Sequence, residues 1–184
     1  MATKVLVDAD QVRRTIARIA HEVVERHPDP SRLALVGIHT RGVPLAARLA
    51  ELIDEFAGTR PAIGTVDIAL YRDDVGLDAR RGALPVVGDT VLDFDVSDRV
   101  VILVDDVLFT GRTIRAAIDA IFDYGRPPSV QLAVLVDRGH RELPIRPDYV
   151  GKNLPTARNE FVGVHLTEVD GVDEVVLEPE RRTP

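Results

Sequence analysis

A run of aliphatic residues that ends in two adjacent aspartates is the feature that most constrains this chain. Residues 99–107 read RVVILVDDV, and an apolar run without strict alternation is typical of a strand buried on both faces of a parallel sheet. Asp105 and Asp106 then stand at the carboxyl end of that strand, where open α/β sheets bind their ligands. We therefore predict an α/β fold with a ligand site at this strand end.

The rest of the chain supplies the other parts of such a sheet. Apolar stripes at helical spacing predict helices over residues 8–26, 45–57 and 113–125. Aliphatic runs predict strands over 32–38, 62–72, 129–138, 148–153, 160–166 and 173–178. Residues 73–98 are polar, with DTVLDFDV alternating like an exposed hairpin arm, and so long a stretch is typical of a functional flap. Buried strands separated by helices favour a mostly parallel sheet covered on both faces.

Composition narrows the class of protein. The chain has 184 residues, 45% of them apolar, which fits one domain over residues 1–184. It has no cysteine, which excludes disulfides and thiolate catalysis and favours the cytoplasm. We see no signal peptide, and no apolar run reaches the roughly 18–20 residues that a membrane span needs. The net charge of −7 means that nucleic acid could be bound only by a local patch.

The segment after the acids, FTGRT (109–113), has the chemistry of a phosphate-binding loop. Backbone N–H groups, the hydroxyls of Thr110 and Thr113, and the N-terminus of the next helix all favour a phosphate. Asp105 and Asp106 would repel that anion, and they suit hydroxyl groups or a Mg²⁺ ion beside it. A ribose 5-phosphate satisfies both halves of the segment, so we predict a sugar-phosphate site.

Other interpretations of this strand end explain less. A Walker A loop needs G-x-x-x-x-G-K-[ST], which the chain lacks, and GIHTRG (37–42) lacks the glycine spacing of a dinucleotide fold. An acidic Mg²⁺ pocket would explain the two aspartates but not the TGRT after them. The remaining alternative is a pair of acids that only caps a turn, which is a costly arrangement without a ligand.

A second loop, HTRGVP (39–44), also joins a strand to a helix. Arg41 can bind a second anion, Gly42 permits a close backbone approach, and Thr40 precedes them. The alternative is an ordinary helix start with a surface arginine. Two anion loops and a diol clamp together imply a sugar with phosphate at one end and diphosphate at the other, which is 5-phosphoribosyl 1-diphosphate (PRPP).

The stretch VILVDDVLFTGRT resembles the PRPP-binding signature of type I phosphoribosyltransferases. Its residues are Val101, Ile102, Leu103, Val104, Asp105, Asp106, Val107, Leu108, Phe109, Thr110, Gly111, Arg112 and Thr113. The chain further resembles the PyrR family over almost its entire length. The segments that carry this likeness are RIAHE (18–22), GIHTRGVPLAARLAE (37–51), LYRDD (70–74), VDRGHRELPIRPDYVGKN (136–153) and VDGVDEVVL (169–177).

The resemblance implies a fold and two activities. The fold is that of type I phosphoribosyltransferases, with a flap at about 72–98 and a small hood from about 1–12 and 139–184. The reaction is uracil + PRPP → UMP + diphosphate, with Mg²⁺ carried by PRPP and no direct metal site. The second activity is binding of the pyr mRNA leader, controlled by UMP or UTP, to attenuate pyrimidine genes. A uracil or purine phosphoribosyltransferase without an RNA role is the alternative, and a homo-oligomer is expected.

The resemblance also implies residue roles. Asp105 and Asp106 would hold the ribose hydroxyls. The 5-phosphate would contact Phe109, Thr110, Gly111, Arg112 and Thr113, and the diphosphate would contact Thr40, Arg41 and Gly42. The flap would contribute Arg72, Arg80 and Arg81. The base would contact Asp137, Arg138 and Val162. Purine-using relatives carry an acid where Phe109 stands, and phenylalanine cannot take a proton, which argues against a purine substrate.

Two groups of basic residues are candidates for the RNA contact. They are Arg14, Arg18 and His21 on one helix face, and His140, Arg141, Arg146 and Lys152 in a second segment. Arginine and histidine can neutralise phosphates and contact unpaired bases. A single arginine on an amphipathic helix is ordinarily just solvated, so this prediction rests on the cluster. Ala17 departs from the pattern, because relatives can carry a hydroxyl residue there.

Overall fold

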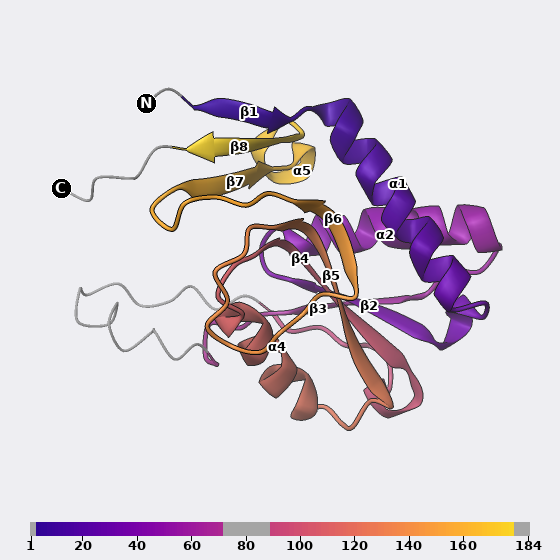
Figure 1. Cartoon of the computed structure of the whole chain (residues 1–184). Coiled ribbons are helices and arrows are strands. Elements are labelled where there is room, and N and C mark those ends of the chain that lie inside the picture. Colours follow the sequence, from indigo (N-terminus) through magenta and orange to yellow (C-terminus); the bar gives the residue numbers. More distant parts are fainter. Residues whose placement is uncertain (1–2, 72–88, 179–184) are drawn as a thin grey trace.

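A five-stranded parallel sheet forms the centre of the protein, and β4 is its middle strand (Figure 1). The computed structural model describes residues 3–71 and 89–178. The strand order is β3-β2-β4-β5-β6, and each neighbouring pair is parallel. The strands are β2 (Leu33–Ile38), β3 (Ala62–Val66), β4 (Val100–Leu108), β5 (Ser129–Asp137) and β6 (Tyr149–Asn153).

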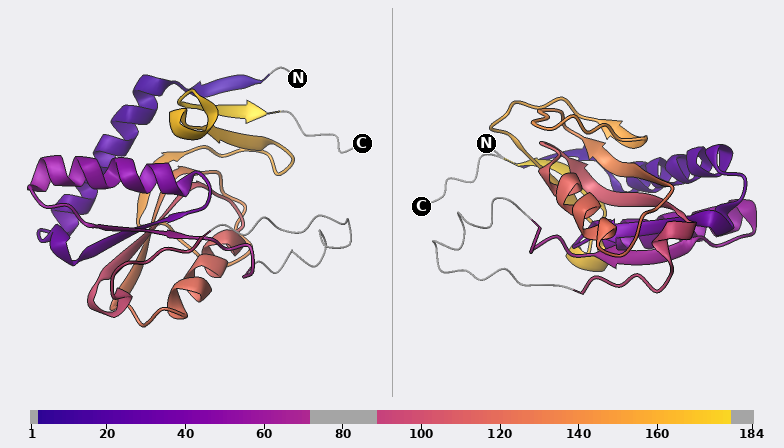
Figure 2. Two further views of the ribbon diagram at one scale, coloured as in Figure 1. Left: turned by 180° about the vertical axis from the view of Figure 1, so that it is seen from behind. Right: turned by 90° about the horizontal axis from the view of Figure 1, so that it is seen from below.

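Helices cover both faces of this sheet, as Figure 2 shows. They are α1 (Ala9–Arg26) and α2 (Gly42–Ala57) on one face and α4 (Arg112–Phe122) on the other. In β4, Ile102 and Val104 belong to the apolar cluster with α1 and α2, whereas Val101 and Leu103 belong to the cluster with α4. Burial from both faces explains why the strand has no polar alternation, and the predicted α/β architecture is confirmed.

A second, smaller sheet forms a hood at one end of the molecule (Figure 1). It is antiparallel in the order β1-β8-β7, with β1 (Lys4–Val7), β7 (Phe161–His165), β8 (Glu174–Glu178) and the short helix α5 (Thr167–Asp170). We call these four elements the hood. The range 139–184 predicted for its C-terminal part is too wide, because β6 pairs with β5 in the central sheet.

The segment after the predicted flap packs against the sheet. Val91 exchanges two backbone hydrogen bonds with Thr65 of β3, at 2.9 and 3.0 Å. Phe94 packs against the α4-side core, and Val96 is only 1% exposed. The range 72–98 is therefore too long for a flap at its C-terminal end, and the exposed hairpin arm is not found there. Residues 72–88 lie outside the described residues.

Several element boundaries differ from the sequence prediction. Strand β3 ends at Val66 instead of residue 72, because the Asp67 carboxylate accepts a hydrogen bond from the Ala69 N–H and forms a turn. Helix α2 begins at Gly42, three residues earlier than predicted, and α4 begins at Arg112. Within 3–71 and 89–178, no helix has the length and apolar character to cross a membrane.

Candidate active site

Asp105 and Asp106 project at the carboxyl end of the central strand. The pairing of β2 with β4 ends at Gly37 and Val104, so both acids lie beyond the last residues that these two strands pair. Asp105 Oδ1 accepts the Asp106 N–H at 2.9 Å, and Asp106 Oδ1 accepts the Val107 N–H at 2.7 Å. Each carboxylate is thus held by the backbone of the next residue, which fixes both at the predicted position.

Burial strongly affects the ionisation of this pair. It raises the pKa of Asp105 well above the ordinary value, and the nearby charge of Asp106 adds to the effect. Burial also raises the pKa of Asp106, although the Val107 N–H and the Arg41 charge act in the opposite direction. Asp105 borders a small apolar cavity under α1 and α2. A cation or a set of hydroxyl donors at this point would favour the ionised carboxylates.

The loop that follows these acids, where we predict a phosphate, is held by packing and by backbone hydrogen bonds. Gly111 has a φ of 93° and directly precedes α4, and it offers no side chain to cap the helix. A Cβ at Gly111 would lie 3.3 Å from Ile145 Cδ1, so the loop is closely packed. The Thr110 carbonyl accepts the N–H groups of Glu142 and Leu143 at 2.9 and 3.1 Å. The segment after β5 therefore supports the predicted phosphate loop.

The second anion loop lies directly beside the acids. A Cβ at Gly42 would come within 2.2 Å of the Val104 carbonyl oxygen and 3.4 Å of Asp105 Cα. Gly42 thus makes a close backbone approach to β4, whereas the approach to an anion stays a prediction. The peptide bond between His39 and Thr40 is cis, and Thr40 is exposed. The start of α2 and the end of β4 together bring the two predicted loops to one place.

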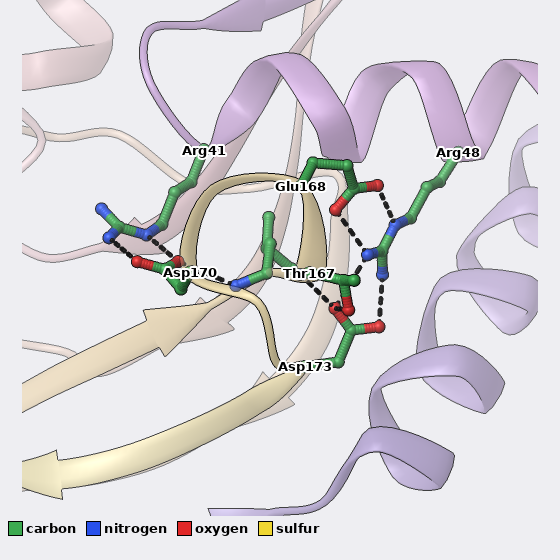
Figure 3. Close-up of polar contacts among 7 residues, drawn as sticks. Arg41, Arg48, Thr167, Glu168, Asp170 and Asp173 are labelled. Atoms are coloured by element: carbon green, nitrogen blue, oxygen red, sulfur yellow. Dashed lines mark hydrogen bonds and ion pairs between the residues drawn. The ribbon is translucent and has the colours of Figure 1, made fainter.

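Arg41 meets a partner that the sequence did not indicate. Its Nε and Nη2 donate to the two carboxylate oxygens of Asp170 in α5, at 3.0 and 2.7 Å (Figure 3). This pairing raises the pKa of Arg41 and lowers that of Asp170. The Asp-Gly pair at 170–171 is typical of a turn, and nothing in the pattern connects it with residue 41. Arg41, which we predict to bind the diphosphate, is thus paired with a residue of the hood.

Phe109 is the first residue of the predicted phosphate loop, and its ring contacts two basic side chains. The Arg138 guanidinium is 4.1 Å from its ring centroid, and the His140 ring meets it edge-on at 6.0 Å. Arg138 is only 5% exposed, and it donates to the Thr156 hydroxyl and the Ala157 carbonyl at 3.2 and 3.1 Å. Arg138, predicted at the base end, therefore lies beside Phe109.

The other two predicted base contacts have different surroundings. Asp137 accepts the Gly139 N–H at 2.9 Å and pairs with Arg141, so its carboxylate closes the turn after β5. Val162 lies on β7, and its side chain is buried in the core. Asp137 adjoins Arg138 at the strand end, whereas the Val162 side chain packs into the core beneath the hood.

The predicted RNA residues of α1 have different surroundings, and Arg18 lies against β6. Arg18 Nη2 donates to the carbonyls of Val150 and Gly151, at 3.0 and 2.5 Å. His21 stacks on Phe56 of α2, with ring centroids 3.8 Å apart. Arg14 and Arg146 are exposed. These contacts place the basic face of α1 beside the strand that carries Lys152.

Arg141 and His140 depart from the predicted RNA patch. Arg141 donates to the carbonyls of Ile145 and Phe109, each at 3.0 Å, and pairs with Asp137. His140 Nε2 lies 2.6 Å from the Thr156 carbonyl. The chain turns sharply here, with positive φ at Gly139 and His140, and the next side chains bind carbonyls of neighbouring segments. Arg141 therefore binds the predicted phosphate loop directly, whereas His140 binds the Thr156 carbonyl and meets the Phe109 ring edge-on. Arg72, Arg80 and Arg81 lie outside the described residues.

Solved structures of phosphoribosyltransferases share the fold of this chain. The chain superposes on the hypoxanthine phosphoribosyltransferase of Trypanosoma cruzi in complex with IMP, with a TM-score of 0.71 and 22% identity over 96% of this chain and 95% of that one. A hypoxanthine-guanine phosphoribosyltransferase from Bacillus anthracis gives a TM-score of 0.70 and 18% identity, covering 96% and 98%. Residues 3–168 match the phosphoribosyl transferase domain. The fold and the sequence thus define a protein of the phosphoribosyltransferase class.

Curated relatives narrow this class further. The "Bifunctional protein PyrR" of Deinococcus radiodurans is 57% identical over 172 residues, covering 94% of this chain and 92% of that protein. Its namesake from Roseiflexus sp. is 57% identical over 178 residues, covering 96% of each. The one from Clostridioides difficile is 56% identical over 172 residues, covering 94% and 96%. The chain belongs to the PyrR family.

Proposed function

We propose that this protein transfers ribose 5-phosphate from PRPP to uracil, and that it binds a pyr mRNA leader under the control of uridine nucleotides. One observation carries the enzymatic half. The buried Asp105 and the half-buried Asp106, near the end of β4, lie between the proposed phosphate loop and the arginine-bearing loop. A ribose with anions at both ends fits this order of groups.

The residues have distinct tasks in the transfer. Departure of diphosphate leaves positive charge on the ribose ring, as in glycoside hydrolysis. Asp105 and Asp106 would hold the ribose hydroxyls and set negative charge beside that ring. Arg41 would hold the leaving diphosphate, and Thr110 to Thr113 the 5-phosphate. Mg²⁺, arriving on PRPP, would add positive charge to the leaving group, and the Asp pair offers it carboxylate oxygens.

The base end supports a pyrimidine. The Phe109 ring has no proton acceptor for an imidazole N–H of a purine, and the Arg138 guanidinium already stacks on it. A purine phosphoribosyltransferase remains the alternative enzyme. Competition of uracil against hypoxanthine and guanine in the same assay decides between them, and faster transfer to either purine would reject the pyrimidine assignment.

The RNA half rests on the family and on basic residues of α1 and of the segment 146–152. The exposed residues Arg14 and Arg146 and the half-buried Lys152 are the phosphate contacts that we propose, with Arg18 and His21 beside them on α1. His140 and Arg141 leave this set because they are half-buried and bound to internal carbonyls, whereas Arg18, which also donates to internal carbonyls, is exposed. An enzyme without an RNA role is the alternative.

Two measurements test the two halves separately. Steady-state formation of UMP from uracil and PRPP tests the transferase, and binding of UMP without turnover would contradict it. Filter binding of the leader RNA, with and without UMP, tests the regulator, and an affinity that UMP does not raise would contradict it. Arg14→Ala is expected to weaken RNA binding and leave UMP formation unchanged. The proposal also includes a homo-oligomer in the cytoplasm. Sedimentation of the purified protein tests the oligomeric state.

A further inference from the structure

Arg41 already holds an anion in the place where the proposed function needs another. The Asp170 carboxylate engages its Nε and Nη2, the edge of a guanidinium that grips carboxylates and phosphates in two parallel hydrogen bonds. Asp106 also lies close enough for its charge to act on the guanidinium. A diphosphate that approaches the start of α2 therefore meets an arginine whose Nε and Nη2 donors are already bound to Asp170.

Asp170 does not depend on Arg41 to keep its position. Its Oδ2 also accepts the Leu166 N–H at 2.9 Å, which closes the short helix α5 on itself. The carboxylate therefore keeps one backbone donor if the guanidinium turns away, and the loss of Arg41 leaves no buried, unsatisfied charge.

A second arginine holds α5 on α2 independently. Arg48 donates to both oxygens of Glu168, at 2.7 and 2.6 Å, and to both oxygens of Asp173, at 2.8 Å each (Figure 3). Asp173 in turn accepts the N–H and the hydroxyl of Thr167. The hood is thus fastened by Arg48, about two turns along the helix from Arg41, so the Arg41 pair can open without releasing the hood.

We propose that Asp170 is a positioning residue that occupies, in the free protein, the edge of Arg41 that diphosphate takes in the complex. The inference rests on the proposed function and deepens it. Binding of diphosphate exchanges one anion for the other on the same two N–H donors. The Arg41–Asp170 pair must break first, so Asp170 weakens diphosphate binding and favours its release after transfer.

Equilibrium binding of inorganic diphosphate with Mg²⁺ tests the exchange. Asp170→Asn keeps an oxygen for the Leu166 N–H but removes the charge that competes for Arg41. Calorimetry should give a dissociation constant roughly three- to tenfold lower than in the unchanged protein, the effect expected for one partly exposed bidentate pair. The KM for PRPP should fall in parallel. An unchanged or weaker affinity, or a loss of kcat without a change in KM, would overturn the proposal.

Glu168→Gln is the matched control. Glu168 lies on the same short helix and pairs with an arginine of the same α2, but it touches Arg48. This variant should bind diphosphate as the unchanged protein does, whereas an equal gain would mean that loosening the hood is the cause. If Asp170→Asn proves unstable, Asp170→Ser, which keeps a short acceptor, takes its place in the same titration.

A double variant shows whether Asp170 acts through Arg41. In an Arg41→Lys background, the bidentate edge is absent, so Asp170→Asn should no longer change diphosphate affinity. A persistent gain would overturn the exchange. Failure of this inference differs from failure of the proposed function: if the unchanged protein neither forms UMP nor binds diphosphate, the transferase proposal itself is wrong.

Discussion

Arg141 donates from Nη1 to the Phe109 backbone carbonyl at 3.0 Å, and so ties the segment after β5 to the phosphate loop. The same guanidinium also reaches the Ile145 carbonyl and the Asp137 carboxylate. One side chain therefore connects the end of β5, the start of the FTGRT loop and the segment that packs on Gly111. The predicted base end and the predicted phosphate end of the site are therefore joined by the same contacts.

Replacement of Arg141 by alanine should impair catalysis. The variant leaves the Phe109 and Ile145 carbonyls and the Asp137 carboxylate without this donor, which costs about 1–3 kcal/mol of stability. We expect a lower Tm and at least about a tenfold loss of kcat/KM from the displaced loop. Arg146→Ala, a change at an exposed arginine nearby, should leave both values almost unchanged. Normal UMP formation by Arg141→Ala would contradict this role.

Removal of the Asp105 charge should stabilise the free protein while it abolishes transfer. Burial raises the pKa of Asp105 above its unfolded value, so the unfolded chain loses its proton first as the pH rises. The free energy of unfolding therefore falls between these two pKa values, and Asp105→Asn removes that loss. Thermal melts should show a larger gain in Tm at pH 7.5 than at pH 4.5. A lower Tm at pH 7.5, or retained kcat/KM, would refute the assignment.

Replacement of Asp173 by asparagine should destabilise the protein by an amount that depends on pH. Arg48 lowers the pKa of Asp173 to about 2, so this pair stabilises the fold above the unfolded pKa and is lost as the pH falls toward 2. Asp173→Asn should cost about 1–2 kcal/mol at pH 7, a value reduced for partial solvent exposure. Urea melts at pH 7 and pH 3 measure this, and an equal loss at both would exclude the ion pair as the cause.

A methyl group at Gly42 should disrupt the site through the backbone. Gly42 lies in α2 and needs no special φ, but its Cβ would lie 2.2 Å from the Val104 carbonyl. Gly42→Ala should therefore lose about 1–3 kcal/mol by overpacking and raise the KM for PRPP. Gly58→Ala is the contrast, because Gly58 has a φ of 66° and open space around it. Its cost should be about 1 kcal/mol, with KM unchanged.

The sequence alone predicted the parts of this protein that depend on local pattern. The run from Val101 to Val104 has no polar alternation, because the strand is covered on both faces, and this placed the Asp pair at the ligand edge of the sheet. The two anion loops follow from strand-to-helix connections with glycine at the close approaches. The same local signals do not define the ends of segments well, so the predicted hood wrongly includes β6 and the predicted flap is too long.

Only the tertiary structure decided which partner each charged side chain meets. Arg41 and Asp170 are 129 residues apart, and Arg141 and the Phe109 carbonyl are 32 apart. A guanidinium on a helix or turn looks solvated in the sequence, because hydrophobic periodicity reports burial and not hydrogen-bond geometry. Packing of the hood on α2, and of the turn after β5 on the phosphate loop, set the directions of these donors. The sequence thus predicts which strand end carries the candidate site, and the fold determines which internal partners Arg41 and Arg141 meet.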